Sequence, residues 1–333
     1  MIVLVTGGAG FVMSNLVRHL LETDAQARVV ILDRDPLDSP AVEFFRPVRD
    51  RLTSVQGDVR DRAVLDDIAA AHPITHVVHA ATVTHAPAWE QADPARFVEV
   101  NVMGTVSVLE WARALPGLQR FIYVSSGAVY GFPLPDSPAG TQPEAGPFNP
   151  PELYAITKRT AEMIARRYGE LFGLDVRQVR FSAVFGPMER PTSARVTMSL
   201  PHSVMQAYRE GRPLRVTAET LEAGGDFLSA EDVAEALARL LRRPRLSYEV
   251  YNIAYGVFTS VPELLAAFRS AVGPLEVQTV AAGEAEVAMD PSERRARWNA
   301  YAIERIAADT GWRPRPLEEQ WAGYLRWVRG QGT

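Results

Sequence analysis

The sequence contains no cysteine among its 333 residues. Disulfide bonds, thiolate metal ligands and cysteine nucleophiles are therefore excluded. The chain has no apolar run long enough to span a bilayer, and its apolar N-terminus lacks the basic flank and small-residue cleavage site of a signal peptide. We therefore expect a cytoplasmic protein that does not bind membranes.

An excess of positive charge is also missing. The formal net charge is −5, so the composition does not favour binding to nucleic acid or to an anionic membrane. The histidines do not show the spacing of metal ligands, and we predict no metal site. The remaining composition is that of an ordinary globular protein, with 47% hydrophobic and 23% charged residues. This length allows one large α/β domain with a smaller lobe.

Strand-like and helix-like segments alternate through the first half of the chain. The predicted strands are Ile2–Val5, Val29–Leu32, Thr53–Gln56, His76–His79, Arg120–Ser125 and Val176–Phe181. The predicted helices are residues 11–23, Ala63–Ala71, Pro94–Leu115 and Tyr154–Phe172. Residues 131–151 are rich in proline and glycine and predict a loop. The alternation indicates a doubly wound parallel sheet with helices on both faces.

A glycine-rich turn joins the first predicted strand to the first predicted helix. The turn Thr6-Gly7-Gly8-Ala9-Gly10-Phe11 would let the backbone and the free N–H groups of the helix approach a pyrophosphate. Met13 stands where the usual fingerprint has a third glycine, so we expect a slightly displaced helix or a small residue facing it. Taken alone, the turn fits either a dinucleotide site or a glycine turn without a ligand.

Two carboxylates at predicted strand ends favour the dinucleotide. Asp33 ends the second strand, where it can accept hydrogen bonds from a ribose diol and repel a 2′-phosphate. Asp58 follows the third strand, within reach of an adenine amino group. Arg34 could pair with a 2′-phosphate, so the sequence favours NAD over NADP without excluding NADP. We predict an NAD-binding Rossmann domain over residues 1–180 and an interleaved, smaller C-terminal α/β substrate lobe over residues 181–333.

A tyrosine and a lysine lie one helical turn apart at the start of the last predicted helix. An ammonium at Lys158 would lower the pKa of the Tyr154 phenol, ordinarily about 10, and make it a general acid or base near neutral pH. Such a pair also occurs by chance on exposed helices. Here, however, Ser126 follows a predicted parallel strand, where its hydroxyl could hold a substrate oxygen near Tyr154.

The sequence resembles the extended short-chain dehydrogenase/reductases, the nucleotide-sugar epimerase/dehydratase family, almost from end to end. The matching segments are Thr6–Phe11, Asp33, Gly57-Asp58, His79-Ala80-Ala81, Asn101 with Gly104-Thr105, Val124–Gly131, Tyr154 with Lys158, Phe185-Gly186-Pro187, Asp226-Phe227-Leu228 with Asp232-Val233, and Gly311-Trp312 with Pro314. The resemblance implies that Ser126, Tyr154 and Lys158 are catalytic, and that Asn101 is buried at a helix kink. The expected cofactor residues are Gly7, Gly10, Phe11, Val12, Asp33, Arg34, Asp58, Val59, Ala80, Ala81 and Lys158.

Two substitutions on the substrate side depart from the family pattern. Ala183 stands where nucleotide-sugar enzymes usually carry asparagine, and Gly225 where they often carry an arginine that grips the diphosphate. These changes remove two strong phosphate donors. Arginines that could compensate, or could simply lie on a solvated face, are Arg190, Arg195, Arg294, Arg295 and Arg297. The candidate substrate residues are Thr84, His85, Ser126, Ala183, Arg190 and Arg294.

The resemblance implies hydride transfer between NAD and a secondary alcohol of a sugar, polyol or sugar acid. A dehydrogenase would release the ketone and NADH, whereas a nucleotide-sugar epimerase would retain the ketone and return the hydride to its other face. The resemblance disfavours a 4,6-dehydratase, because Gly127-Ala128 lacks the acidic pair that those members carry. The alternative from another class is a non-catalytic NAD sensor.

The resemblance also implies a homodimer formed by helices 94–115 and 154–172.

Overall fold

Seven parallel strands form the central sheet of the computed structural model, which describes residues 1–131, 141–288 and 300–330. In spatial order they are β3 (Leu52–Gln56), β2 (Arg28–Asp33), β1 (Ile2–Thr6), β4 (His76–His79), β5 (Arg120–Val124), β6 (Val176–Phe181) and β11 (Val250–Ile253). The strand order reverses beside β1, as in a doubly wound fold. The predicted fold class is confirmed, and the ends of the predicted strands are correct to within one residue.

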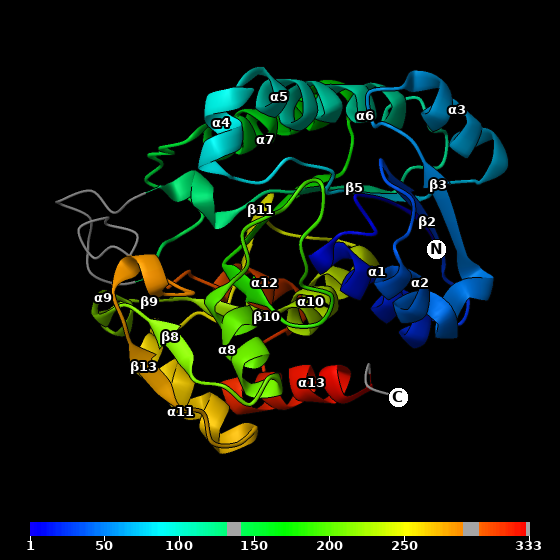
Figure 1. Ribbon diagram of the computed structural model, residues 1–333. Helices are drawn as coiled ribbons and strands as arrows, with labels where there is room; N and C mark the ends of the chain where they lie inside the picture. The colour runs from blue at the N-terminus through cyan, green and yellow to red at the C-terminus, as the bar shows by residue number, and fades with distance from the viewer. Residues whose placement is uncertain (132–140, 289–299, 331–333) are drawn as a thin grey trace.

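Helices cover both faces of the sheet (Figure 1). On one face lie α3 (Arg62–Ala71), α4 (Pro87–Ala92), α5 (Ala95–Phe97), α6 (Gly104–Ala112) and α7 (Leu153–Phe172). On the other face lie α1 (Phe11–Thr23), α2 (Ser39–Phe45), η1 (Arg46–Arg51), α10 (Ala230–Arg242) and α12 (Glu304–Thr310). In β1, Val3 and Val5 pack toward α1 and α10, whereas Leu4 packs toward α3 and α6. Both faces are buried, which explains why β1 is an unbroken apolar run in the sequence.

The segment predicted as one helix, Pro94–Leu115, is interrupted. It consists of α5, a π-helical turn η2 (Val98–Met103) and α6. Asn101 lies in the π-helical turn and is 1% exposed, and its Oδ1 accepts a hydrogen bond from the backbone N–H of Val83 at 2.8 Å. Its Nδ2 donates to Thr157 Oγ1 at 3.1 Å. The interruption therefore lets Asn101 join the loop after β4 to helix α7.

The second half of the chain contributes to two structural units. β11 pairs in parallel with β6, and α10 packs on α1, so both extend the sheet domain. The smaller lobe contains α8 (Leu200–Arg209), α9 (Ala218–Glu222), α11 (Val261–Ala271), η4 (Ala282–Glu284), α13 (Leu317–Gly330) and the strand pairs β7 (Ala183–Phe185) with β10 (Phe227–Ser229), β8 (Leu214–Val216) with β13 (Val277–Thr279), and β9 (Gly224–Gly225) with β12 (Thr259–Ser260). Its core is aromatic, with the ring centroids of Phe185 and Trp321 4.9 Å apart.

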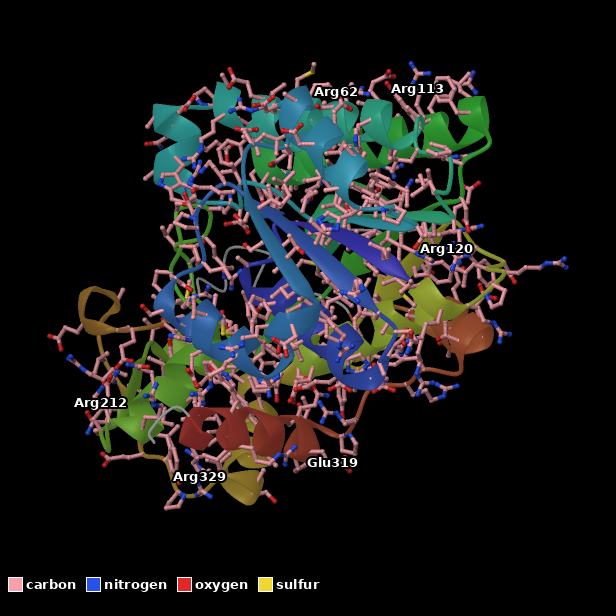
Figure 2. All side chains as sticks on the ribbon, turned by 90° about the vertical axis from the view of Figure 1, so that its right-hand side faces the viewer. Arg62, Arg113, Arg120, Arg212, Glu319 and Arg329 are labelled. Atoms are coloured by element: carbon pink, nitrogen blue, oxygen red, sulfur yellow. The ribbon has the colours of Figure 1, made fainter. Side chains whose placement is uncertain are left out.

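Charged side chains lie over the outside of both units. Figure 2 shows Arg62 and Arg113 on the helical layer that contains α3 and α6, and Arg212 and Arg329 at the opposite end of the molecule. Many of these charges form pairs within a helix, such as Arg166 Nε with Glu170 Oε1 at 3.0 Å. Over the described ranges, no helix is both long and apolar enough to cross a membrane.

Candidate functional site

The turn between β1 and α1 brings its backbone close to the end of β4. Gly7 has φ +68°, and a Cβ there would lie 3.1 Å from the Cα of Ala81, so a side chain would be strained and crowded. Gly10 precedes α1 and supplies no side-chain cap, and the first turn of α1 carries no acidic residue. The N–H groups of the first turn of α1 are therefore left for an anion. These residues fit the pyrophosphate of a dinucleotide.

The Thr6 hydroxyl holds the backbone at the end of β4 beneath the glycine turn. It accepts hydrogen bonds from the backbone N–H groups of Ala80 and Ala81, each at 3.1 Å. It also lies 2.7 Å from His79 Nδ1, while His79 Nε2 lies 3.0 Å from Thr105 Oγ1. Since Thr105 Oγ1 donates to the Asn101 carbonyl, it accepts from Nε2–H, and Nδ1 accepts from Thr6. The network thus requires neutral His79, and burial lowers its pKa to about 3.

Asp33 lies where a ribose would follow the pyrophosphate. Its Oδ2 accepts a hydrogen bond from the backbone N–H of Ala9 at 3.2 Å, and burial raises its pKa above the ordinary value. This carboxylate fits the expected diol acceptor. Arg34 is exposed, and its Nη2 donates to Ser193 Oγ at 2.6 Å. Its guanidinium therefore already has a partner within the chain.

The remaining predicted cofactor residues lie along the same edge of the sheet. Asp58 Oδ2 is 2.8 Å from Arg60 Nη2, and the hydrogen bonds from Arg60 lower the pKa of Asp58. That carboxylate is thus already paired, and its predicted contact with adenine has no support from this geometry. The predicted residues next to these groups are buried or half-buried, namely Phe11, Val12, Val59, Ala80 and Ala81. Met13 is 4% exposed and packs in the core that α1 shares with α10.

Residues 189–195, which we call the strap, cross the edge of the sheet that carries these groups. Arg190 Nη2 donates to the Ala9 carbonyl in the glycine turn at 3.1 Å. The same guanidinium forms an ion pair with Asp38 at 2.7 Å, immediately before α2. Arg190 was predicted to contact the substrate, but these contacts favour a role on the cofactor side.

The other end of the strap is tied to the loop after β4. Thr84 Oγ1 donates to the Ala194 carbonyl at 2.7 Å, so this predicted substrate residue is engaged by the strap. The Arg195 guanidinium lies 5.3 Å from the centre of the Phe11 ring and pairs with buried Glu189 at 2.8 Å. The strap therefore joins both sides of the edge on which a dinucleotide would lie.

The structure brings Ser126, Tyr154 and Lys158 together at the ends of β5 and α7. Ser126 begins the 3-10 turn η3 (Gly127–Tyr130), and its Oγ accepts from the Ala128 N–H at 3.1 Å. A hydrogen bond also joins the side chains of Ser126 and Tyr154. Lys158 lies one turn after Tyr154, is 2% exposed, and donates from Nζ to the Val124 carbonyl at 2.8 Å.

The acid–base properties of this group differ from the sequence-based expectation. Burial raises the pKa of Tyr154, while the hydrogen bond with Ser126 and the charge of Arg195 act in the opposite direction. The predicted lowering of the Tyr154 pKa by Lys158 is wrong for this structure. Burial also lowers the pKa of Lys158 to about 7, so its charge is incomplete at neutral pH. Its ammonium is directed at the carbonyl of β5.

A carboxylate from α4 anchors the start of the catalytic helix. Glu90 Oε1 accepts a hydrogen bond from the backbone N–H of Leu153 at 3.0 Å, one residue before Tyr154. His85 Nδ1 lies 3.5 Å from the other oxygen of Glu90. His85 was predicted at the substrate, and Arg195 was named only as an arginine that could replace the missing phosphate donors, whereas Glu90 was not selected. Their roles depend on contacts between distant segments, which sequence spacing does not reveal.

A buried network of hydrogen bonds connects α7 and η3 to the central sheet. Arg180 forms two hydrogen bonds with Glu162, Nε to Oε1 at 2.7 Å and Nη2 to Oε2 at 2.8 Å. The same guanidinium donates to Tyr130 Oη at 2.8 Å, and Tyr130 donates to Asn252 at 2.6 Å. The network links the helix that carries Lys158, the turn that follows Ser126 and the edge strand β11.

The positions of the missing phosphate donors lie in the smaller lobe. Ala183 is exposed at the start of β7, and its N–H donates to the Asp226 carbonyl at 3.0 Å. Gly225 is buried in β9. Arg294, Arg295 and Arg297 lie outside the described residues. Within the described part of the chain there is no group of three acidic or histidine side chains that could hold a metal ion.

Comparison with known proteins extends this description. Residues 3–254 match the model of the NAD-dependent epimerase/dehydratase family. The chain is 31% identical over 336 residues to a dTDP-glucose 4,6-dehydratase of Streptomyces antibioticus. The match covers 98% of this chain and 92% of that protein. It superimposes on the NAD complex of the Thermus thermophilus UDP-glucose 4-epimerase with a TM-score of 0.77, at 26% identity and 99% coverage of both chains.

Some relatives are much longer than this chain. A trifunctional UDP-glucose 4,6-dehydratase/UDP-4-keto-6-deoxy-D-glucose 3,5-epimerase/UDP-4-keto-L-rhamnose-reductase of Arabidopsis thaliana is 29% identical over 255 residues. That match covers 75% of this chain but only 36% of the relative. The chain therefore corresponds to about a third of such multifunctional proteins.

Proposed function

This chain belongs to the NAD-dependent epimerase/dehydratase family, and we propose that it oxidises a secondary alcohol of a nucleotide-linked sugar and then returns the hydride to the same molecule. It is an enzyme, and NAD is its cofactor. The observation that carries the proposal is the grouping of Ser126, Tyr154 and Lys158 at the edge of the sheet that holds the glycine turn. A sensor would need none of these three side chains.

In the proposed mechanism, Tyr154 moves the proton of the reacting hydroxyl. The glycine turn and Asp33 would hold NAD, which would supply the hydride acceptor for the carbon that carries this hydroxyl. Tyr154 as phenolate takes the O–H proton, so that a C=O bond forms, and returns it when the carbonyl is reduced. Ser126 hydrogen-bonds the substrate oxygen and orients it toward Tyr154. Burial raises the pKa of Tyr154, and the positive charge of Arg195 opposes this rise and so favours the phenolate.

The strap favours internal return of the hydride over release of NADH. Arg190 joins the strap to Ala9 and Asp38, and Thr84 joins it to the loop after β4. A cofactor beneath these contacts would leave only after they open. Retention of the cofactor suits a cycle in which oxidation and reduction occur on one enzyme molecule. We therefore favour internal return of the hydride, as in an epimerase cycle, over net dehydrogenation.

The relatives support a nucleotide sugar as substrate, since their names specify UDP- and dTDP-linked sugars. A second candidate is net dehydrogenation of a compact sugar, polyol or sugar acid. The observation that favours it is the absence of phosphate donors at Ala183 and Gly225. Gly127, next to Ser126, also has no acidic side chain for a dehydration step.

The test separates these candidates in one set of reactions. The purified protein is incubated with UDP-sugars, dTDP-sugars and small polyols, with and without added NAD. Absorbance of reduced nicotinamide is followed while products are identified by chromatography. We expect conversion of a nucleotide sugar without net NADH, and no conversion by Tyr154→Phe, which should still bind NAD. Steady NADH formation from a small alcohol would instead establish the second candidate. Failure of Tyr154→Phe to reduce turnover would contradict the mechanism.

We also propose that the protein acts as a cytoplasmic homodimer. Apolar side chains are exposed on the layer formed by η2 and α7, with Met103 at 53%, Ile156 at 41% and Met163 at 60% exposure. A second copy packed on this layer would remove these groups from water. The dimer would leave the edge of the sheet that carries the glycine turn accessible to the substrate.

A further inference from the structure

Tyr301 lies against the backbone immediately after Ser126. It is 4% exposed, and its ring centroid is 5.4 Å from that of Tyr130 in η3. A Cβ added at Gly127 would lie 2.5 Å from the Tyr301 hydroxyl oxygen and 2.7 Å from its Cζ. The phenol therefore occupies the space into which a side chain at Gly127 would project.

Hydrogen bonds from two different segments fix the backbone around Tyr301, and they thereby fix the position of its side chain. The Tyr301 N–H donates to buried Asp226 Oδ2 at 3.2 Å. On the other side, the Gln142 N–H donates to the Ala300 carbonyl at 2.6 Å, and the Ala302 N–H donates to the Gln142 carbonyl at 3.0 Å. Contacts with both the smaller lobe and the loop after η3 thus direct the Tyr301 ring at Gly127.

The hydroxyl of Tyr301 is the unusual part of this arrangement. Among the described residues it has no hydrogen-bond partner, in contrast to Tyr130, whose hydroxyl bonds Arg180 and Asn252. A phenylalanine would fill the same space, so packing against Gly127 does not require the hydroxyl. The hydroxyl is therefore available to a partner from outside the described residues.

We propose that the Tyr301 hydroxyl is a specificity-determining group that hydrogen-bonds a hydroxyl of the sugar next to the reacting carbon. This inference rests on the proposed function, because it takes Ser126 as the group that holds the reacting oxygen. Gly127 is bonded to Ser126, and the proposal places the sugar ring held by Ser126 and Tyr154 beside Tyr301. Burial keeps the pKa of Tyr301 well above its ordinary value, so the phenol stays neutral and recognises rather than transfers a proton.

The arrangement also bears on which reaction the site can support. An acidic side chain at position 127 would collide with the Tyr301 ring at less than ordinary contact distance. Gly127 and Tyr301 therefore fit each other: the Tyr301 phenol occupies the space that a side chain at position 127 would need. A neutral hydroxyl in this place suits recognition of a sugar hydroxyl better than its elimination as water.

The experiment compares Tyr301→Phe with the wild type on the substrate that the wild type turns over best. We expect kcat/KM to fall about 2- to 10-fold, mostly through KM, as for loss of one neutral hydrogen bond. The difference should vanish for the substrate analogue that lacks the hydroxyl on the neighbouring carbon. Equal kcat/KM for variant and wild type would overturn the proposal, as would an equal loss on every deoxy analogue.

Stability gives a second readout that does not depend on activity. Tyr251→Phe is the matched control, because the Tyr251 hydroxyl donates to Asp309 at 2.6 Å, away from Ser126. We expect Tyr251→Phe to lower the Tm and Tyr301→Phe to leave it unchanged or raised. A drop in Tm for Tyr301→Phe as large as that of the control would reveal a structural partner and overturn the proposal. If the wild type converts no nucleotide sugar, the proposed function fails, while this comparison still shows whether the Tyr301 hydroxyl has a structural partner.

Discussion

At the scale of single residues, the site depends on groups that hold one protonation state. The Thr6 hydroxyl accepts from the N–H groups of Ala80 and Ala81, so its own proton must go to His79 Nδ1. A proton on Nδ1 would face an oxygen whose lone pairs are already used. Neutral His79 therefore fixes the backbone against which Gly7 packs.

This arrangement predicts a loss of stability at mildly acidic pH. An unfolded histidine has a pKa of about 6.5, whereas burial lowers the pKa of His79 to about 3. Between these values the unfolded state binds one more proton, so the stabilisation present above pH 6.5 is lost as pH falls toward 3. From pH 7.5 to 5.5 the expected contribution of His79 is a loss of about 1.4 kcal/mol.

Urea unfolding of the wild type and of His79→Gln at both pH values measures this contribution. Glutamine cannot take up the proton but can still donate to Thr105. The variant should therefore lose about 1.4 kcal/mol less than the wild type over that pH interval. Equal pH dependence of the two proteins would mean that His79 is not held neutral in the folded state.

Residue roles could be predicted from the sequence only where local spacing creates them. Tyr154 and Lys158 lie on one helix, and Gly7 and Gly10 lie in one turn, so the sequence alone brings each pair together. The sign of the Tyr154 pKa shift could not be predicted, because it depends on burial among distant segments. Tyr301 escaped selection for the same reason, since it reaches Gly127 only through the fold.

At the scale of elements, the strap is the feature most closely tied to the cofactor. Arg190 holds it to the glycine turn and to the N-terminus of α2, which begins after Asp38. These contacts are charge-assisted, but the Asp38 side chain is 44% exposed, which weakens the pair through solvent screening. The strap should therefore slow the release of NAD without preventing it.

Arg190→Gln should speed the dissociation of NAD by about tenfold, the effect of roughly 1.4 kcal/mol, since it removes the ion pair with Asp38 and weakens the bond to Ala9. The measurement is the NAD content of the purified protein and its rate of loss on dilution. Arg239→Gln is the control, because it removes an ion pair with Glu235 that lies on α10. An unchanged rate of NAD release in Arg190→Gln would show that the strap does not retain the cofactor.

The elements of the sheet were predictable to a greater degree than the elements that interrupt or extend it. Strands such as His76–His79 and Val176–Phe181 are buried on both faces, so their sequences are continuous apolar or β-branched runs. The break in the helix after Pro94 was expected only from the family resemblance, as a kink at Asn101, because it depends on the contacts of Asn101 with Val83 and Thr157. The short helix α2 and the edge strand β11 were also missed.

At the scale of the whole molecule, the division of the chain is less simple than its sequence suggests. The second lobe was predicted over residues 181–333 as interleaved with the first domain, without naming the interleaved elements; β11 and α10 both pack on the sheet domain. Arg120 shows how the parts are joined, since its Nη1 donates to the Arg243 carbonyl after α10 at 2.7 Å. Residues 1–180 alone would therefore lose the strand that pairs with β6 and the helix that packs on α1.

The layer formed by η2 and α7 leads to a prediction about assembly. Met163 is 60% exposed on α7, the helix that carries Tyr154 and Lys158, and Met103 is 53% exposed on the neighbouring turn. Exposed apolar groups on one face are typical of a surface that another molecule covers. A second copy would bury this face and add support to the outer side of the catalytic helix.

Sedimentation over a range of concentrations should therefore show a dimer for the wild type and a monomer for Met163→Glu, because a buried unpaired carboxylate in an apolar interface costs several kcal/mol. Val42→Glu is the matched control, since Val42 is 56% exposed but lies on α2, on the opposite face of the sheet. The control should remain a dimer. A wild type that stays monomeric at all concentrations, or a dimer that survives Met163→Glu, would show that this layer is not the interface. Retention of activity by the Met163→Glu monomer would further show that the site is complete within one chain.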